Sequence, residues 1–169
     1  DRFQVRSASE AADRWLAAVV GAPLRFVRLG DDAVGRPQAQ RLHVVTLESA
    51  AEVDALLRSR GLPPADPLRY RPNLVLAGRG APLVPFVDDL LAAAEWPGGR
   101  IEVQAACIRC VVPDVDPANG IAGHGVLDAM AELSAQRRPG GPVALGVYGR
   151  ATPRARIGRG QAMSLVFAF

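Results

Sequence analysis

The strand-like segments of this chain are short, and loops that contain proline or glycine separate them. Strands are expected at residues 24–28, 42–46, 73–77, 100–105, 143–148 and 163–169, where the sequence alternates or forms brief apolar runs. The regular alternation of strand and helix that builds a parallel sheet is missing. The pattern therefore predicts a mixed α/β fold, mainly β, in which a partly closed β-barrel carries peripheral helices.

Helices are expected at four places around these strands. Two of them begin with the spacing of a capping box, at Ser7 and at Ser49, and end near Gly21 and Gly61. A short helix is predicted over residues 87–94, and an apolar stripe predicts another over residues 126–138. Residues 30–40 are polar and are expected to form a loop.

Composition restricts the function classes. The net charge is only +3, every basic residue is arginine, and aromatic residues make up 5% of the chain, so no platform for nucleic acid is expected. No apolar run approaches the ~20 residues that span a bilayer, and no signal peptide is evident. These features predict a cytoplasmic protein with no membrane span and one domain over residues 1–169. Because the chain starts at Asp1 without a methionine, it could be a piece of a longer protein.

The only two cysteines, Cys107 and Cys110, stand two residues apart after a strand-like run. Four interpretations are open: thiol–disulfide exchange, a zinc site completed by His43 and His124, two ordinary buried thiols, or one thiolate that binds a soft, redox-active metal. Valine and proline follow Cys110 where exchange would need a helix, and the histidines lack zinc-site spacing. Arg109, between the cysteines, would favour a thiolate or an anionic ligand nearby.

Two further motifs flank the cysteines in sequence. In Arg71-Pro72-Asn73, proline should force Arg71 into an extended conformation, so that Arg71 and Asn73 share a face and could grip a phosphate or a polar heterocycle. The alternative is that Arg71 pairs with a surface carboxylate and Asn73 caps a strand edge. In the second motif, Gly146 would permit close backbone approach, and Tyr148 would offer a ring and a hydroxyl or would simply be a core residue.

Taken in order, these motifs resemble the MOSC domain, the C-terminal domain of molybdenum cofactor sulfurases. The resembling pattern is R-P-N before a short strand, then C-x-R-C followed by V-D-P-x-x-G, then G-x-Y near the C-terminus. It covers roughly residues 10 to 165. The likeness is closest to the amidoxime-reducing branch of that superfamily, and it implies the family's MOSC-type mixed β-barrel.

The resemblance also implies a cofactor and residues that bind it. Cys110 would supply the thiolate to molybdenum, which the dithiolene of a molybdopterin holds otherwise. Residues implied to grip or adjoin this cofactor are Arg71, Asn73, Arg109 and Tyr148, and Arg41 could serve as a phosphate ligand. Asp114 and Asp116 are candidates for proton relay, by proximity only, and Asp116 could equally serve its turn.

The implied activity is reductive removal of oxygen from N-hydroxylated substrates, with an iron–sulfur or haem protein as electron donor. A sulfur-carrier or cofactor-delivery module, or a non-catalytic MOSC-like binding domain, are the alternatives. Three features depart from the family pattern: the family's N-terminal β-rich subdomain is not expected within residues 1–169, Ala39-Gln40-Arg41 replaces small hydroxyl residues, and residues 155–161 lack the usual aspartate.

Overall fold

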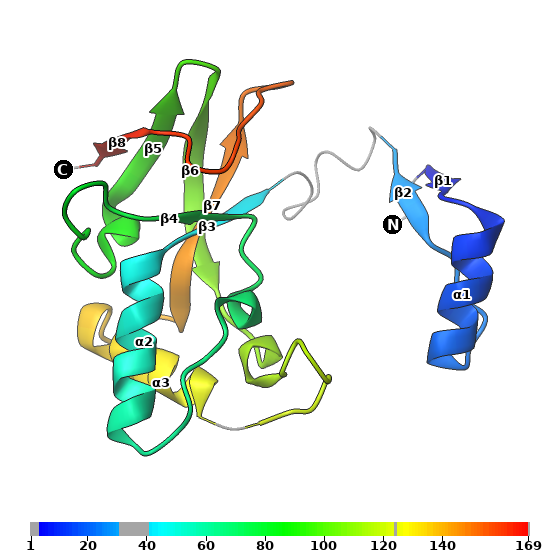
Figure 1. Ribbon diagram of the computed structural model, residues 1–169, viewed down its shortest axis with the longest axis horizontal. Coiled ribbons are helices and arrows are strands. Elements are labelled where there is room, and N and C mark those ends of the chain that lie inside the picture. The colour runs from blue at the N-terminus through cyan, green and yellow to red at the C-terminus, as the bar shows by residue number, and fades with distance from the viewer. Residues whose placement is uncertain (1–3, 31–40, 124, 169) are drawn as a thin grey trace. The chain divides into compact units, whose positions relative to one another are not determined.

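A computed structural model describes residues 4–30, 41–123 and 125–168, which fall into two units divided between Gln40 and Arg41. Figure 1 shows the elements of each unit. Residues 31–40 of the loop predicted at 30–40 lie outside the described residues, as does His124. Among the described residues, no helix combines the length and the apolar character needed to cross a bilayer.

The first unit contains one helix and a two-stranded antiparallel sheet. Its elements are β1 (Val5–Ser7), α1 (Glu10–Val20) and β2 (Val27–Leu29). The side chain of Ser9 caps α1 by accepting a hydrogen bond from the Ala12 N–H at 3.0 Å, so the helix starts two residues later than the capping box at Ser7 predicts. Gly21 ends the helix in the left-handed conformation, as predicted.

The second unit is built on a six-stranded sheet in the order β4-β3-β7-β6-β5-β8 (Figure 1). Only β3 and β4 run parallel, and every other neighbouring pair is antiparallel. The strands are β3 (Leu42–Thr46), β4 (Leu74–Leu76), β5 (Leu91–Trp96), β6 (Gly99–Ile108), β7 (Ala144–Ala151) and β8 (Ser164–Phe167). This mainly antiparallel sheet with helices around it confirms the predicted fold class.

Helices α2 (Leu47–Ser59) and α3 (Val126–Arg137) lie together against β3 and β7. The side chain of Thr46 caps α2, so this helix begins earlier than the capping box at Ser49 predicts. Three short 3₁₀ helices complete the unit: η2 (Pro67–Tyr70), η3 (Val87–Leu90) and η4 (Val112–Asp114).

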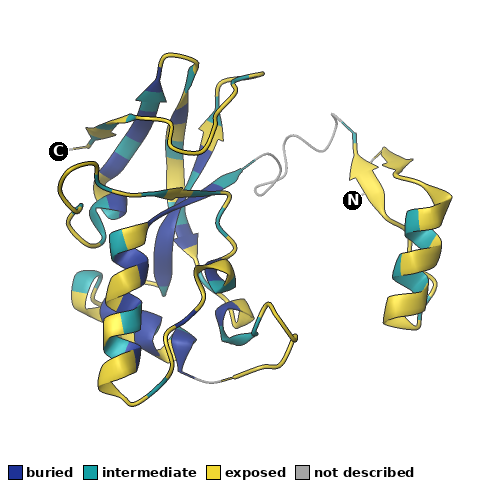
Figure 2. Cartoon of the chain, viewed as in Figure 1, coloured by how far each residue is buried: buried dark blue, intermediate teal, exposed yellow. Residues whose placement is uncertain are grey.

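Two hydrophobic clusters occupy the two faces of the sheet. Val45 belongs to the cluster under α2 and α3, whereas its neighbour Val44 belongs to a second cluster with Trp96 and Ile101. Successive residues of a strand point to opposite faces, so β3 serves both clusters. The dark blue of Figure 2 follows the central strands and the sheet-facing sides of the two helices. His43 and Thr46 on β3 are buried between these clusters and the neighbouring strands, so their polar atoms need partners there.

One predicted element is wrong. The helix expected over residues 87–94 is the 3₁₀ helix η3 followed by strand β5, which pairs with β6 on one side and β8 on the other. Its alanines favour a helix locally, but two neighbouring strands satisfy the backbone of β5 and bury Leu91 and Trp96.

Candidate functional site

Three neighbouring strands bring His43, Tyr148 and Cys107 together on one face of the sheet. His43 on β3 lies directly opposite Tyr148 on β7, and their ring centres are 5.7 Å apart. Cys107 lies on β6 where the register with β7 shifts, beyond the pair Ala105–Tyr148. His43 and Cys107 are buried, and Tyr148 is half-buried. The sheet therefore places an imidazole, a phenol and a thiol side by side in a position that water hardly reaches.

A glycine makes room for this histidine. Gly146 has a φ of 73°, and a Cβ built on it would stand 2.7 Å from His43 Nε2 and would collide with the Val44 carbonyl oxygen. The prediction that Gly146 permits close approach is thus confirmed. The ring nitrogens Nε2 and Nδ1 face the carbonyl oxygens of Leu145 at 3.1 Å and of Arg71 at 3.4 Å. Each ring nitrogen of His43 thus has a backbone carbonyl within reach, and the nitrogen that carries the hydrogen can donate to the carbonyl it faces.

Arg109 joins the buried thiol to a neighbouring element. Its Nη1 donates to Cys107 Sγ at 2.9 Å, and its Nη2 donates to the Tyr70 carbonyl at 2.9 Å. Residues i and i+2 of an extended chain share a face, which explains why Arg109 reaches Cys107. The guanidinium therefore ties the end of β6 to η2.

The surroundings shift the proton affinities of this cluster. Burial raises the pKa of the Cys107 thiol, but hydrogen bonds from His43 and Tyr148, with the charges of His43 and Arg109, outweigh burial and lower this pKa to about 7. The hydrogen bond to Cys107, together with burial, raises the pKa of Tyr148 above its ordinary value. The same hydrogen bond therefore favours the thiolate of Cys107 and keeps the proton on Tyr148.

Cys110 contrasts with Cys107, because it is exposed. It follows the end of β6, where the Arg109 N–H donates to the Val143 carbonyl at 2.9 Å and holds the chain to the start of β7. Both cysteines are free thiols. An exposed thiol beside a guanidinium is accessible to a ligand from outside, whereas the buried thiol is not.

The structure corrects the predicted conformation of Arg71. This residue is left-handed, with φ 53° and ψ 48°, rather than extended, because it ends η2 with its N–H donating to the Leu68 carbonyl at 2.9 Å. Asn73 exchanges two hydrogen bonds of 2.8 Å with the backbone of His43, one of them through its side-chain oxygen. Asn73 thus caps the start of β4, as its alternative interpretation proposed. Both side chains are exposed.

The four residues that the resemblance assigns to cofactor binding, and Arg41 as a possible phosphate ligand, lie close to His43, Cys107 or the Tyr148 ring. The Arg41 guanidinium lies 5.8 Å from the centre of the Tyr148 ring. Arg71 and Asn73 contact His43, Arg109 contacts Cys107, and Tyr148 contacts His43. Residues distant in sequence therefore meet in one place, although their role toward a cofactor stays a prediction. Sequence reasoning missed His43 as their common neighbour, since only the pairing of β3 with β7 reveals it.

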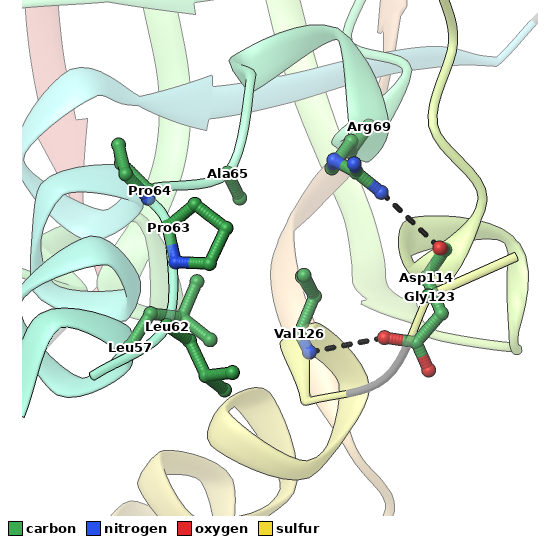
Figure 3. Close-up of a pocket in the computed structure, with 9 residues that line it drawn as sticks. All are labelled: Leu57, Leu62, Pro63, Pro64, Ala65, Arg69, Asp114, Gly123 and Val126. Atoms are coloured by element: carbon green, nitrogen blue, oxygen red, sulfur yellow. Dashed lines mark hydrogen bonds between the residues drawn. The ribbon is translucent and has the colours of Figure 1, made fainter. Parts of the chain in front are cut away.

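The two aspartates proposed as proton relays are engaged in local structure. Figure 3 shows Asp114 Oδ1 accepting from the Val126 N–H at 3.0 Å, and the Leu127 N–H donates to the same oxygen at 3.1 Å. This carboxylate caps α3, beside a small pocket of about 110 Å³ that neither cysteine lines. Asp116 pairs with Arg69 at 3.3 Å and accepts from the Ala118 N–H at 2.8 Å in its own turn. Their relay role stays a prediction.

A metal held by the protein alone does not fit this site, but a metal with its own chelator does. In the part of the chain that the structure describes, no three His, Cys, Asp or Glu side chains lie close enough to hold an ion together. Exposed Cys110 can offer one soft ligand, and Arg41 and Arg71 can offer charge to an anionic group. A chelated metal that needs one thiolate and carries a phosphate matches this donor set.

The comparisons with known proteins decide the family. The model of the MOSC domain matches residues 27–164 of the chain. This protein is a member of the MOSC domain family. MOSC domains are associated with binding of the molybdenum cofactor. The comparison with curated proteins gave no match.

Proposed function

We propose that this MOSC domain binds molybdenum-molybdopterin through the Cys110 thiolate and reduces N-hydroxylated substrates. The observation that carries the proposal is the pair of contrasting thiols: Cys107 is buried and bonded to Arg109, whereas Cys110 is exposed three residues later. Only Cys110 can meet a ligand from outside. The family match covers residues 27–164, and we propose that residues 1–169 form one MOSC domain.

The chain's own residues would hold the cofactor as follows. Arg41 and Arg71 bind its anionic groups, and the Asn73 amide donates to the heterocycle from its Nδ2, since its oxygen already accepts from His43. Tyr148 and Arg109 line the side that faces Cys107. When bound, the cofactor supplies oxygen-transfer chemistry, in which an N–OH group takes two electrons and two protons and yields N–H and water. We propose an iron–sulfur or haem protein as the electron donor.

The test is metal and pterin content. The protein is expressed in a host that makes the cofactor, and molybdenum and the fluorescence of released, oxidised pterin are measured per chain. Cys110→Ala should lose most of its molybdenum, whereas Val111→Ala, an exposed neighbour outside the site, should keep it. The rate of amidoxime reduction per chain should be proportional to the molybdenum content. Equal molybdenum in Cys110→Ala and the unmodified chain would refute the assignment of the ligand.

The exposure of Cys110 also favours a second candidate, a sulfur-carrier or cofactor-delivery module. A persulfide on an exposed thiol can be passed to a partner, and a buried one cannot. Mass spectrometry after incubation with a desulfurase would then find a mass increase of about 32 Da on Cys110, from one added sulfur atom. A chain without metal, pterin or this adduct under all these conditions would instead be a non-catalytic binding domain.

A further inference from the structure

Arg109 lacks the partner that a partly buried guanidinium usually has. Among the ion pairs between described residues, none includes Arg109, and its Nε is buried without a hydrogen-bond partner. A charge removed from water is costly unless an opposite charge compensates it. The one acceptor with anionic character that Arg109 reaches is Cys107 Sγ, at 2.9 Å. The positive charge of Arg109 is compensated only if this sulfur carries negative charge.

Cys107 itself does not have the surroundings of an ordinary buried thiol. Such thiols pack among hydrocarbon like small apolar residues. Cys107 is 0% exposed, but a guanidinium, an imidazole and a phenol adjoin it, and all three favour its thiolate. Three donors from β3, β7 and the end of β6 thus converge on one sulfur.

We propose that Cys107 is a buried thiolate that positions Arg109 and Tyr148 for the cofactor site at Cys110. The thiolate fixes the guanidinium, whose other nitrogen binds the Tyr70 carbonyl and so holds η2 and Arg71 near the end of β6. Cys107 touches no ligand from outside, since it is fully buried. It is a positioning residue, and its effect on the cofactor passes through Arg109. The positioning role rests on the proposed function, whereas the charge on Cys107 does not.

The charge is tested on cofactor-free protein. In a Cys110→Ser background Cys107 is the only thiol, so below the pH at which tyrosines ionise the ultraviolet absorbance of the thiolate reports Cys107. We expect titration near pH 7, against about 8.5 for an unperturbed thiol. Arg109→Gln should raise the midpoint by about one pH unit or more, while Arg79→Gln, an exposed control, should leave it in place. A midpoint at or above about 8.5 in the background chain would overturn the proposal.

Positioning is tested on the loaded protein by exchanging residue 107. Cys107→Ala should lower molybdenum and pterin retention after gel filtration by about tenfold, the scale expected for loss of a supporting contact. Cys107→Asp, which keeps a negative charge at similar volume, should recover part of that loss. Circular dichroism and the melting temperature confirm that each variant is folded. Positioning by the charge of Cys107 would be overturned if folded Cys107→Ala kept all of its molybdenum and pterin, or if Cys107→Ala and Cys107→Asp lost equal amounts.

The two proposals fail separately. If Cys110→Ala keeps its molybdenum, the proposed function is wrong, but the titration of Cys107 in the cofactor-free chain is unaffected. If Cys107 titrates as an ordinary thiol while Cys110→Ala loses molybdenum, the function stands and the buried thiolate is wrong.

Discussion

Gly146→Ala should be far more damaging than a single methyl group suggests. The new Cβ would stand 2.7 Å from His43 Nε2 and 3.1 Å from Val45 Cγ2, and it would collide with the Val44 carbonyl oxygen. Gly146 also has a φ of 73°, where an alanine costs roughly 1–2 kcal/mol. Overpacking a tight core adds typically about 1–3 kcal/mol. The free energy of unfolding should therefore fall by about 2–5 kcal/mol.

The matched control is Gly140→Ala. Gly140 has a φ of 74°, but a methyl group added there would have nothing within 4 Å, so only the backbone cost of roughly 1–2 kcal/mol should appear. Urea unfolding gives the free energy of unfolding of both variants. The difference between the two values is the cost of the collision with β3. Because the collision also pushes His43 away, Gly146→Ala should raise the pKa of Cys107 from about 7. Equal destabilisation of the two variants, with an unchanged thiol titration, would refute the tight fit of His43 against β7.

Two further predictions concern stability. The pKa of Cys107 is lowered in the folded chain, so its stabilising contribution is full above the unfolded thiol's pKa and is lost as pH falls through about 7. Between about pH 6 and 9 the free energy of unfolding should rise by about 2 kcal/mol more in the unmodified chain than in Cys107→Ser, and denaturant titrations that show the same pH dependence in both chains would contradict it. Asp114→Ala removes the cap of α3 and should lower the free energy of unfolding by about 1–2 kcal/mol, and Asp114→Asn should lower it by less. The melting temperatures should therefore fall in the order unmodified chain, Asp114→Asn, Asp114→Ala.

Local pattern was enough to place several elements of the fold. Strand β3 has the bounds that alternation at 42–46 predicts, and α3 follows the apolar stripe that starts at Val126. Prediction from the local sequence pattern failed where distant segments of the chain decide the conformation. Residues 91–96 become a strand because β6 and β8 flank them, which no local signal in an alanine-rich segment reveals. Arg71 departs from the extended form because η2 ends there.

The candidate site shows the same limit. Motif order alone selected Arg71, Asn73, Arg109 and Tyr148, and the strand pairing brings them together. The difference in burial between the two cysteines was not predictable, because Cys107 lies on β6 beside a register shift, whereas Cys110 lies beyond the end of that strand. The spacing of Cys107 and Arg109 did carry a usable signal, since residues two apart in a strand share a face.

The number of sulfur atoms around molybdenum tests the central claim most directly. X-ray absorption spectra of the loaded protein would be compared between the unmodified chain and Cys110→Ser, each normalised to its remaining molybdenum. We expect one sulfur neighbour fewer in the variant, because serine replaces the thiolate with an oxygen. An identical sulfur count in both proteins would mean that Cys110 is not bonded to the metal.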